Sequence, residues 1–343
     1  MSHSLINFYK NKYNLKKLKL DFNNKKVIYL IYDEKYYYYL DKNDDFISSS
    51  DDEILLDFIK KINKKYNLQI CNYYPVCFCN NTLVIALRTI ECSSSLKKIN
   101  YKNMPEKYKK LIAYHREKYK TSFLSLNVKK EIEMSQKYIK RYRFHERIIK
   151  KYFLTPERRK KKEYEDLLTT LIPNEKSIID VSCGDSSDVF KVAKDKKFKE
   201  IIGNDICINY LDLKKNNNVI YTNDDIERND IKDKIYDVAY CKNTLHHMNN
   251  ISNINNLLQF IKRISNEIII VEIINPKIQG GLPKFLNKYL YTRFLKDAGT
   301  CYLSESEFKT LINNNFNDEK IRYYTFENIL GKYVIVKISS KGE

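Results

Sequence analysis

Four polar segments in the second half of the sequence each follow a short apolar run. They are residues 180–187 (DVSCGDSS), Asp205, residues 223–227 (NDDIE) and residues 241–248 (CKNTLHHM). In the first, Gly184 lets a tight turn bring backbone N–H groups close to a ligand, because glycine has no side chain. A carboxylate at Asp205 can accept two hydrogen bonds from the vicinal hydroxyls of a ribose. These residue types therefore predict a site for a ribose-bearing ligand.

Each acidic residue also has a plainer interpretation. Asp205 could cap the helix that follows it. Asp225 could accept a hydrogen bond from an adenine amino group, but Asp224 and Glu227 share its loop, so the contact can move by one or two residues. Both interpretations stay open at the level of the sequence.

Three further residues could move a proton. His246 and His247 follow the fourth apolar run and Glu272 ends the fifth. Imidazole titrates near neutral pH, so either histidine could act as a general base toward an O–H or N–H group. The alternative is that one histidine packs and the other orders the loop.

The elements that must position these residues alternate regularly from residue 176 onward. Strands are expected at 177–182, 200–205, 218–222, 236–241 and 267–273, with helices at 187–197, 208–215 and 253–265 between them. Apolar strands separated by amphipathic helices predict a parallel sheet covered on both faces, whose ligands bind beyond the carboxyl ends of the strands. The segments 319–326 and 332–339 are expected to form an antiparallel pair.

The order of these motifs resembles the class I S-adenosylmethionine-dependent methyltransferases, over about residues 170–340. The shared features are the Asp-turn-Gly after the first strand, an acidic residue after the second and third, and Asn243-x-Leu-His-His after the fourth. The resemblance implies an α/β fold, a Rossmann-like, mostly parallel sheet of seven strands with an antiparallel seventh strand. It also implies S-adenosyl-L-methionine as the cofactor and methyl transfer as the activity.

The resemblance assigns roles along the motifs. The turn would contact the amino-acid part of the cofactor, Asp205 the ribose and Asp225 the adenine. Lys242 and Asn243 would line the cofactor beside the acceptor, and His246 and His247 are the catalytic candidates. The turn departs from the family pattern, since Ser182 and Ser186 replace its outer glycines. The full set of expected cofactor residues is Asp180, Ser182, Cys183, Gly184, Asp185, Asp205, Ile206, Asp224, Asp225, Ile226, Lys242 and Asn243.

Three parts of the chain are expected: an α+β domain of unknown role at 1–95, a basic helical linker at 96–172 and the methyltransferase domain at 173–343. In the first part, residues 26–40 are expected to form a hairpin. Ser50 and Glu53 have the spacing of a capping box, as do Ser304 and Glu307.

Charge is distributed unevenly along the chain. Residues 1–175 carry a net charge of +16 and residues 176–343 a net charge of +3. Basic residues are most concentrated in the segment 129–162, which contains 14 basic and 4 acidic residues. It could face RNA or another anionic partner, or form a solvated helical surface.

A small-molecule metabolite, methylated on oxygen or nitrogen, is the expected acceptor. An RNA methyltransferase (tRNA, rRNA or cap) is the alternative, but CKNTLHH is not the Asn/Asp-Pro-Pro-aromatic loop used on base amines. A dehydrogenase is disfavoured because the sequence has no G-x-G-x-x-G. Aromatic residues of the segment 283–303 are expected in a lid over the acceptor: Phe285, Tyr289, Tyr291 and Phe294.

Other features narrow the class of protein. The eight cysteines follow neither a disulfide framework nor the spacing of a zinc site, so no metal is expected. No apolar run approaches the roughly 20 residues of a membrane helix, and the start of the sequence lacks the apolar centre of a signal peptide. The expected setting is the cytoplasm, without a membrane partner, and the oligomeric state is left open.

Overall fold

The computed structural model describes most of the chain, as two compact units. The described residues are 4–22, 25–33, 36–39, 46–92, 96–119, 135, 156–184, 196–211, 219–225, 231–289, 299–328 and 331–340. The first unit consists of residues 1–122 and 223–232, and the second of residues 123–222 and 233–343.

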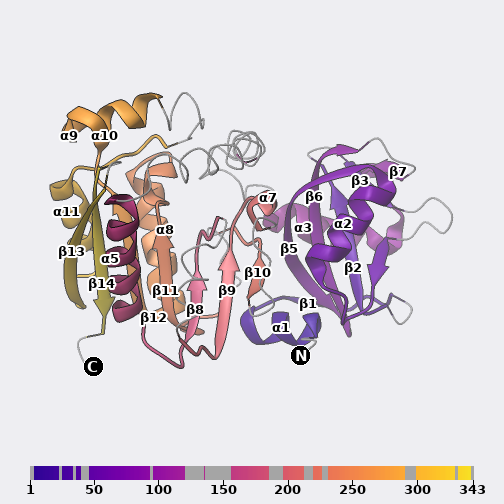
Figure 1. The fold of residues 1–343 in the computed structure, drawn as a ribbon. Helices are drawn as coiled ribbons and strands as arrows, with labels where there is room; N and C mark the ends of the chain where they lie inside the picture. Colours follow the sequence, from indigo (N-terminus) through magenta and orange to yellow (C-terminus); the bar gives the residue numbers. More distant parts are fainter. Residues whose placement is uncertain are drawn as a thin grey trace. The chain divides into compact units, whose positions relative to one another are not determined.

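The first unit is built around a mixed seven-stranded sheet (Figure 1). Its order is β1-β5-β6-β2-β3-β7, with β4 also paired to β2. The predicted hairpin at 26–40 is confirmed as the antiparallel pair of β2 and β3. The elements are α1 (Leu5–Lys12), β1 (Lys17–Leu18), β2 (Val27–Tyr32), β3 (Tyr36–Tyr39), β4 (Ile47–Ser49), α2 (Leu55–Tyr66), β5 (Leu68–Cys79), β6 (Thr82–Cys92), β7 (Lys97–Asn100), the 3-10 helix η1 (Tyr101–Asn103) and α3 (Glu106–Tyr119).

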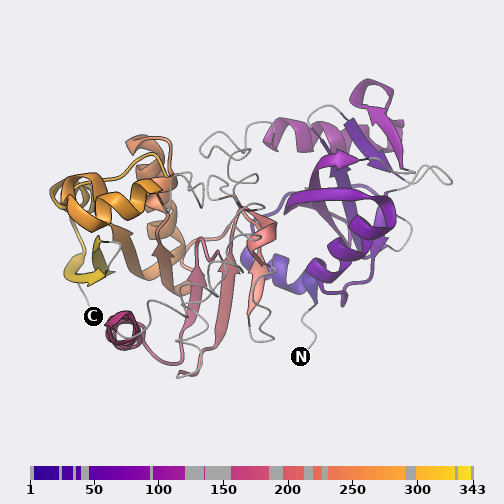
Figure 2. The ribbon, with the colours of Figure 1, turned by 45° about the horizontal axis from the view of Figure 1, so that its top comes forward.

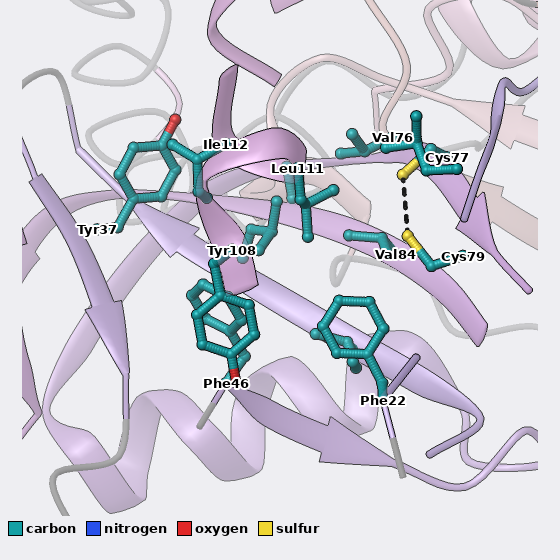
Figure 3. Packing of buried hydrophobic residues seen from close by; sticks show 14 of the residues in the cluster. Phe22, Tyr37, Phe46, Val76, Cys77, Cys79, Val84, Tyr108, Leu111 and Ile112 are labelled. Atoms are coloured by element: carbon teal, nitrogen blue, oxygen red, sulfur yellow. Dashed lines mark hydrogen bonds between the residues drawn. The ribbon is translucent and has the colours of Figure 1, made fainter. Parts of the chain in front are cut away.

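One hydrophobic core of this unit lies between its sheet and α3. Tyr108, Leu111 and Ile112 of α3 are buried against apolar side chains of the strands (Figure 3). Cys77 and Cys79 lie in the same core, with their Sγ atoms 3.8 Å apart. The two cysteines therefore serve as small apolar side chains here.

The capping box predicted at Ser50 is wrong. The helix α2 begins at Leu55, and its N-cap Ile54 makes no side-chain capping hydrogen bond. Asp51, inside the proposed box, instead caps another helix, because its carboxylate accepts hydrogen bonds from the backbone N–H of Ile6 (2.7 Å) and the Ser4 hydroxyl at the start of α1. These hydrogen bonds hold the segment between β4 and α2 against α1, so α2 does not begin before Leu55.

The second unit contains the predicted parallel sheet. Its order is β10-β9-β8-β11-β12-β14-β13; β14 runs antiparallel to β12, and β13 antiparallel to β14. The expected class of fold, including the antiparallel seventh strand, is confirmed. The elements are α5 (Pro156–Leu171), β8 (Ser177–Asp180), β9 (Glu200–Asn204), α7 (Ile208–Leu211), β10 (Ile220–Thr222), β11 (Tyr236–Lys242), η2 (Leu245–His247), α8 (Ile251–Ile264), β12 (Ser265–Ile273), α9 (Pro276–Gln279), α10 (Gly281–Leu286), α11 (Glu305–Asn315), β13 (Lys320–Asn328) and β14 (Gly331–Ser339).

Helices cover both faces of this sheet, as Figures 1 and 2 show. On one face, Tyr164 and Leu168 of α5 pack against alternate strand residues such as Val238 and Val271. On the other, α8 buries an apolar face. Because successive side chains of a strand point to opposite faces and both faces are covered, the central strands β8, β9, β11 and β12 are buried along most of their length. The capping box predicted at Ser304 is confirmed at the start of α11.

No helix in the described part of the chain is long and apolar enough to cross a membrane.

Candidate functional site

The turn after β8 is fixed by the ends of the two neighbouring strands. The Val181 N–H donates to the carbonyl of Tyr240 in β11 (2.8 Å), and the Cys183 N–H donates to the carbonyl of Asn204 in β9 (2.8 Å). Gly184 then adopts φ +49°, and a Cβ built on it would meet no atom of the described residues within 4 Å. The predicted glycine turn is therefore present, in a conformation that favours glycine.

Asp205 lies next to this turn and holds it. Its Oδ2 accepts the Gly184 N–H (2.8 Å), and its Oδ1 accepts the Cys207 N–H (2.9 Å). The side chain is therefore oriented by two backbone donors. A carboxylate has about four lone-pair sites, so it can still accept the hydroxyls of a ribose while making these bonds. Cys207 precedes the first residue of α7, Ile208, so this hydrogen bond lies in the turn before the helix.

Two buried polar residues that the sequence did not single out support the same turn. The Asn204 carboxamide donates to the carbonyl of Val181 (3.0 Å) and accepts from the Thr222 hydroxyl (3.0 Å). This chain of bonds links the ends of β8, β9 and β10. Asn204 directly precedes Asp205 at the end of an apolar strand. A polar residue at this position of an apolar strand is the signal that could have identified Asn204 as part of the site.

Ser182 connects the first turn to the loop after β11. Its hydroxyl hydrogen-bonds to that of Thr244, and Thr244 in turn donates to the carbonyl of Lys242 (3.0 Å). The serine that replaces a family glycine thus makes a contact that glycine cannot make.

Asn243 occupies the bend at the end of β11, in the left-handed conformation at φ +52°. Asparagine tolerates this conformation better than most residues. Among the described residues, no donor lies within hydrogen-bonding distance of its buried Oδ1. A buried acceptor of this kind is costly unless a ligand or water satisfies it.

His246 and Glu272 form a buried pair at the ends of β11 and β12. His246 Nδ1 lies 2.6 Å from Glu272 Oε1, and the two side chains are 6% and 3% exposed. Glu272 also accepts the backbone N–H groups of Leu245 and Ile273, each at 2.9 Å. Because a carboxylate only accepts, Nδ1 carries a hydrogen. The two predicted candidates, His246 and Glu272, are therefore brought together.

The segment that follows residue 298 packs on His246. The N–H groups of Thr300 and Cys301 donate to the His246 carbonyl at 2.8 and 3.0 Å. Tyr302 stacks on the imidazole, with ring centroids 4.8 Å apart and planes at 12°. Gly299 leaves no room for a larger residue, since a Cβ there would lie 2.6 Å from His246 Cδ2.

Other predicted residues lie in different surroundings. Lys242 places its ammonium over the ring of Tyr164 in α5, 4.6 Å from the centroid, so its side chain is on the α5 face of the sheet. The half-buried His247 ring lies against that of His246, with centroids 4.3 Å apart. Asp180 is buried at the end of β8, and Ile206 is half-buried beside Asp205.

The loop after β10 belongs to the first unit. There, Asn223 accepts hydrogen bonds from Asn72 (3.1 Å) and from the Tyr73 N–H (2.8 Å), and buried Asp224 accepts the Tyr13 hydroxyl. Asp225 is buried as well. An adenine contact from this loop stays a prediction. Asp185 and Ile226 lie outside the described residues.

The second-unit residues fit S-adenosylmethionine. Gly184 leaves room for the amino-acid part among the described residues, Asp205 presents an oriented carboxylate for the ribose, and Asn243 presents an acceptor for a polar hydrogen. All three lie at the carboxyl ends of parallel strands, where ligands of such sheets bind.

Comparison with known proteins shows which family of domains the second unit resembles. Residues 153–318 match the family model described as "Methyltransferase domain". A search of the curated proteins found no match.

Three of the solved structures with a similar fold are the following. The YcgJ protein from Bacillus subtilis is 13% identical, covers 53% of this chain and 100% of its own, and has a TM-score of 0.40. Magnesium protoporphyrin IX methyltransferase from Synechocystis PCC 6803 with bound SAH is 15% identical, with 53% and 85% covered and a TM-score of 0.38. A possible exported protein from Bordetella parapertussis is 11% identical, with 54% and 68% covered and a TM-score of 0.42.

The family match and the strand order together decide the assignment. Residues 153–318 therefore form an S-adenosylmethionine-dependent methyltransferase domain within the chain.

Proposed function

We propose that the enzyme transfers the methyl group to an oxygen or nitrogen nucleophile of a small-molecule metabolite. The observation that supports an oxygen or nitrogen nucleophile is the buried pair of His246 and Glu272. An O–H or N–H nucleophile must lose a proton when it is methylated, and an imidazole held by a carboxylate is a suitable acceptor for it.

In the proposed mechanism Glu272 fixes the orientation of His246. With the hydrogen on Nδ1, the neutral imidazole carries its lone pair on Nε2, which would take the proton from the acceptor. The charge on the resulting imidazolium would be stabilised by the Glu272 carboxylate at 2.6 Å. Thr300, Cys301 and Tyr302 keep the histidine in place through its carbonyl and its ring face.

The remaining residues hold and orient. When bound, S-adenosylmethionine supplies an electrophilic methyl group on a sulfonium, so most of the catalysis is positioning and exclusion of water. Asp205 would bind the ribose, and the turn at Gly184 the amino-acid part. Asn243, which lies three residues before His246 in the sequence, would contact the cofactor or the acceptor. Asp225 is retained as the proposed adenine contact.

The acceptor class can be tested directly. The enzyme is incubated with methyl-labelled S-adenosylmethionine and a cell extract that has been separated into a small-molecule filtrate and purified RNA. We expect the label to appear in the filtrate. Label in the RNA fraction alone would contradict the proposal.

The role of the pair is tested with Glu272→Gln and His246→Asn. We expect both variants to bind S-adenosylhomocysteine like the wild type. The Glu272→Gln variant should lose about 10²–10⁴-fold in kcat, the usual contribution of general acid–base catalysis, and its pH profile should change. Unchanged kcat with an unchanged pH profile would show that the pair is structural.

A second candidate, an RNA methyltransferase, is favoured by one observation on the first unit. Exposed lysines lie on β7, η1 and α3. The ammonium of Lys98 lies 3.9 Å from the centroid of the Tyr36 ring. Cations beside aromatic rings are suited to single-stranded nucleic acid. The exposed lysines are Lys97, Lys98, Lys102, Lys107 and Lys110. Salt-independent, weak retention on immobilised RNA would exclude this candidate.

A further inference from the structure

The helical segment after β12 exposes an unusual amount of apolar surface. Seven large hydrophobic side chains are exposed in the described part of the chain, and four of them lie within residues 278–289. They are Ile278 (66% exposed), Leu282 (55%), Phe285 (56%) and Tyr289 (42%). The sequence predicts Phe285 and Tyr289 in a lid over the acceptor, which stays a prediction; both side chains are exposed in this structure. Tyr291 and Phe294, the other two predicted lid residues, lie outside the described residues.

These side chains form one stripe. Leu282, Phe285 and Tyr289 have the spacing i, i+3, i+7, which places them on one face of α10 and the turn that continues it. The rings of Phe285 and Tyr289 touch, with centroids 4.7 Å apart. Ile278, in the preceding helix α9, is exposed as well. We refer to these four residues as the apolar stripe.

Lysines flank the apolar stripe. Lys277, Lys284 and Lys288 are exposed, and the ammonium of Lys288 lies 5.3 Å from the centroid of the Tyr289 ring. The sequence from 273 to 296 contains five Lys and Arg and no Asp or Glu. All charged residues of this segment are therefore cationic.

The sheet holds the base of this segment firmly. Gln279 donates to the carbonyl of Ile274 (2.6 Å) and accepts the N–H of Lys332 in β14 (2.7 Å). Pro276 is buried at the start of α9, and Asn275 caps that helix. Figure 1 shows α9 and α10, in orange, beyond the carboxyl ends of the parallel strands of this unit. The apolar stripe is therefore presented at the same edge of the sheet as His246 and Glu272.

We propose that α9 and α10 lie on the surface of an anionic lipid bilayer, with the apolar stripe inserted at the headgroup boundary. A helix with one apolar face and a polar face rich in lysine binds in this way. No membrane partner was expected from the sequence because no segment can span a bilayer, but a helix that lies on the surface needs only one apolar face. The inference does not depend on which acceptor the enzyme methylates.

Charge complementarity favours a bilayer over other occupants. If a second copy docked through the same stripe, a two-fold contact would bring the lysines of both copies together without an acidic partner from this segment. Nucleic acid would satisfy the lysines but leave the four apolar side chains in water. An anionic bilayer satisfies both faces at once.

The test is flotation of the full-length protein with two kinds of vesicle, phosphatidylcholine alone and phosphatidylcholine mixed with phosphatidylserine. We expect the protein to float with the mixed vesicles. Each lysine near an anionic surface strengthens binding by about fivefold, so Lys284→Glu with Lys288→Glu should weaken it by more than about 25-fold. The double variant Leu282→Ser, Phe285→Ser should fail to float with either kind of vesicle.

Matched controls keep the result specific. Ile251→Ser removes another exposed isoleucine (44% exposed), and Lys320→Glu another exposed lysine; both should float like the wild type. Circular dichroism checks that each variant is folded. Flotation of the stripe variant at the wild-type level, or no flotation of the wild type with mixed vesicles, would overturn the proposal. So would a dimer in light scattering that the stripe variant converts to a monomer.

Discussion

Replacing Asp205 with alanine should separate cofactor binding from folding. In the folded protein Asp205 accepts the N–H groups of Gly184 and Cys207, and in the complex it would also accept two ribose hydroxyls. Hydrogen bonds to a charged group contribute about 1.5–3 kcal/mol each. Loss of the two ribose bonds alone should therefore cost about 3 kcal/mol or more, which corresponds to a roughly 100-fold or larger rise in Kd.

The natural control is Asp237→Ala. Asp237 lies at the amino end of β11 and also accepts two hydrogen bonds, from the N–H (2.8 Å) and hydroxyl (3.0 Å) of Ser177. Each variant should lose about 1–3 kcal/mol of unfolding free energy. Calorimetric titration with S-adenosylhomocysteine should show weak binding for Asp205→Ala and wild-type binding for Asp237→Ala. Equal affinity in the two folded variants would refute the role of Asp205.

Three further outcomes are expected. Burial alone would raise the pKa of Asp237, but its hydrogen bonds and nearby lysines hold that pKa below the usual value. The free energy of unfolding should therefore fall as pH drops below about 4. Circular dichroism should show a smaller fall in Asp237→Asn. Burial raises the pKa of Cys241 to about 12, and Cys301 is partly exposed, so maleimide should label Cys301 before Cys241 in mass spectrometry. Gly299→Ala should displace His246 and lower kcat while leaving calorimetric cofactor affinity unchanged, and wild-type kcat would contradict this.

The sheet of the second unit could be predicted because its signal is local and repeated. Apolar runs such as the one that ends at Asp180 are short, buried on both faces and followed by polar turns. The observed strands β8, β9 and β11 differ from the predicted ranges by two residues or fewer at each end. The strand ends, and with them Gly184, Asp205 and His246, follow from this pattern.

Long-range polar partners could not be predicted in the same way. The bond between Asn204 and Thr222 and the pair of His246 with Glu272 join residues 18 and 26 positions apart. Which side chain meets which depends on the register between parallel strands, and the sequence does not specify that register. For the same reason the sequence did not indicate that Lys242 would turn toward Tyr164.

The two Ser-x-x-Glu motifs show how tertiary contacts decide a local signal. Ser304 accepts the N–H of Glu307, and the Glu307 carboxylate accepts the N–H of Ser304, because α11 starts there without competition. Near Ser50 the same pattern fails, since Asp51 is used to cap α1. A capping box is a local preference, and a partner from elsewhere in the chain can override it.

The most direct measurement is the crystal structure of the protein with S-adenosylhomocysteine. The ribose hydroxyls should lie within hydrogen-bonding distance of the Asp205 carboxylate, with the amino-acid part beside Gly184. A nucleoside bound at any other place on the chain would contradict the site described for this enzyme.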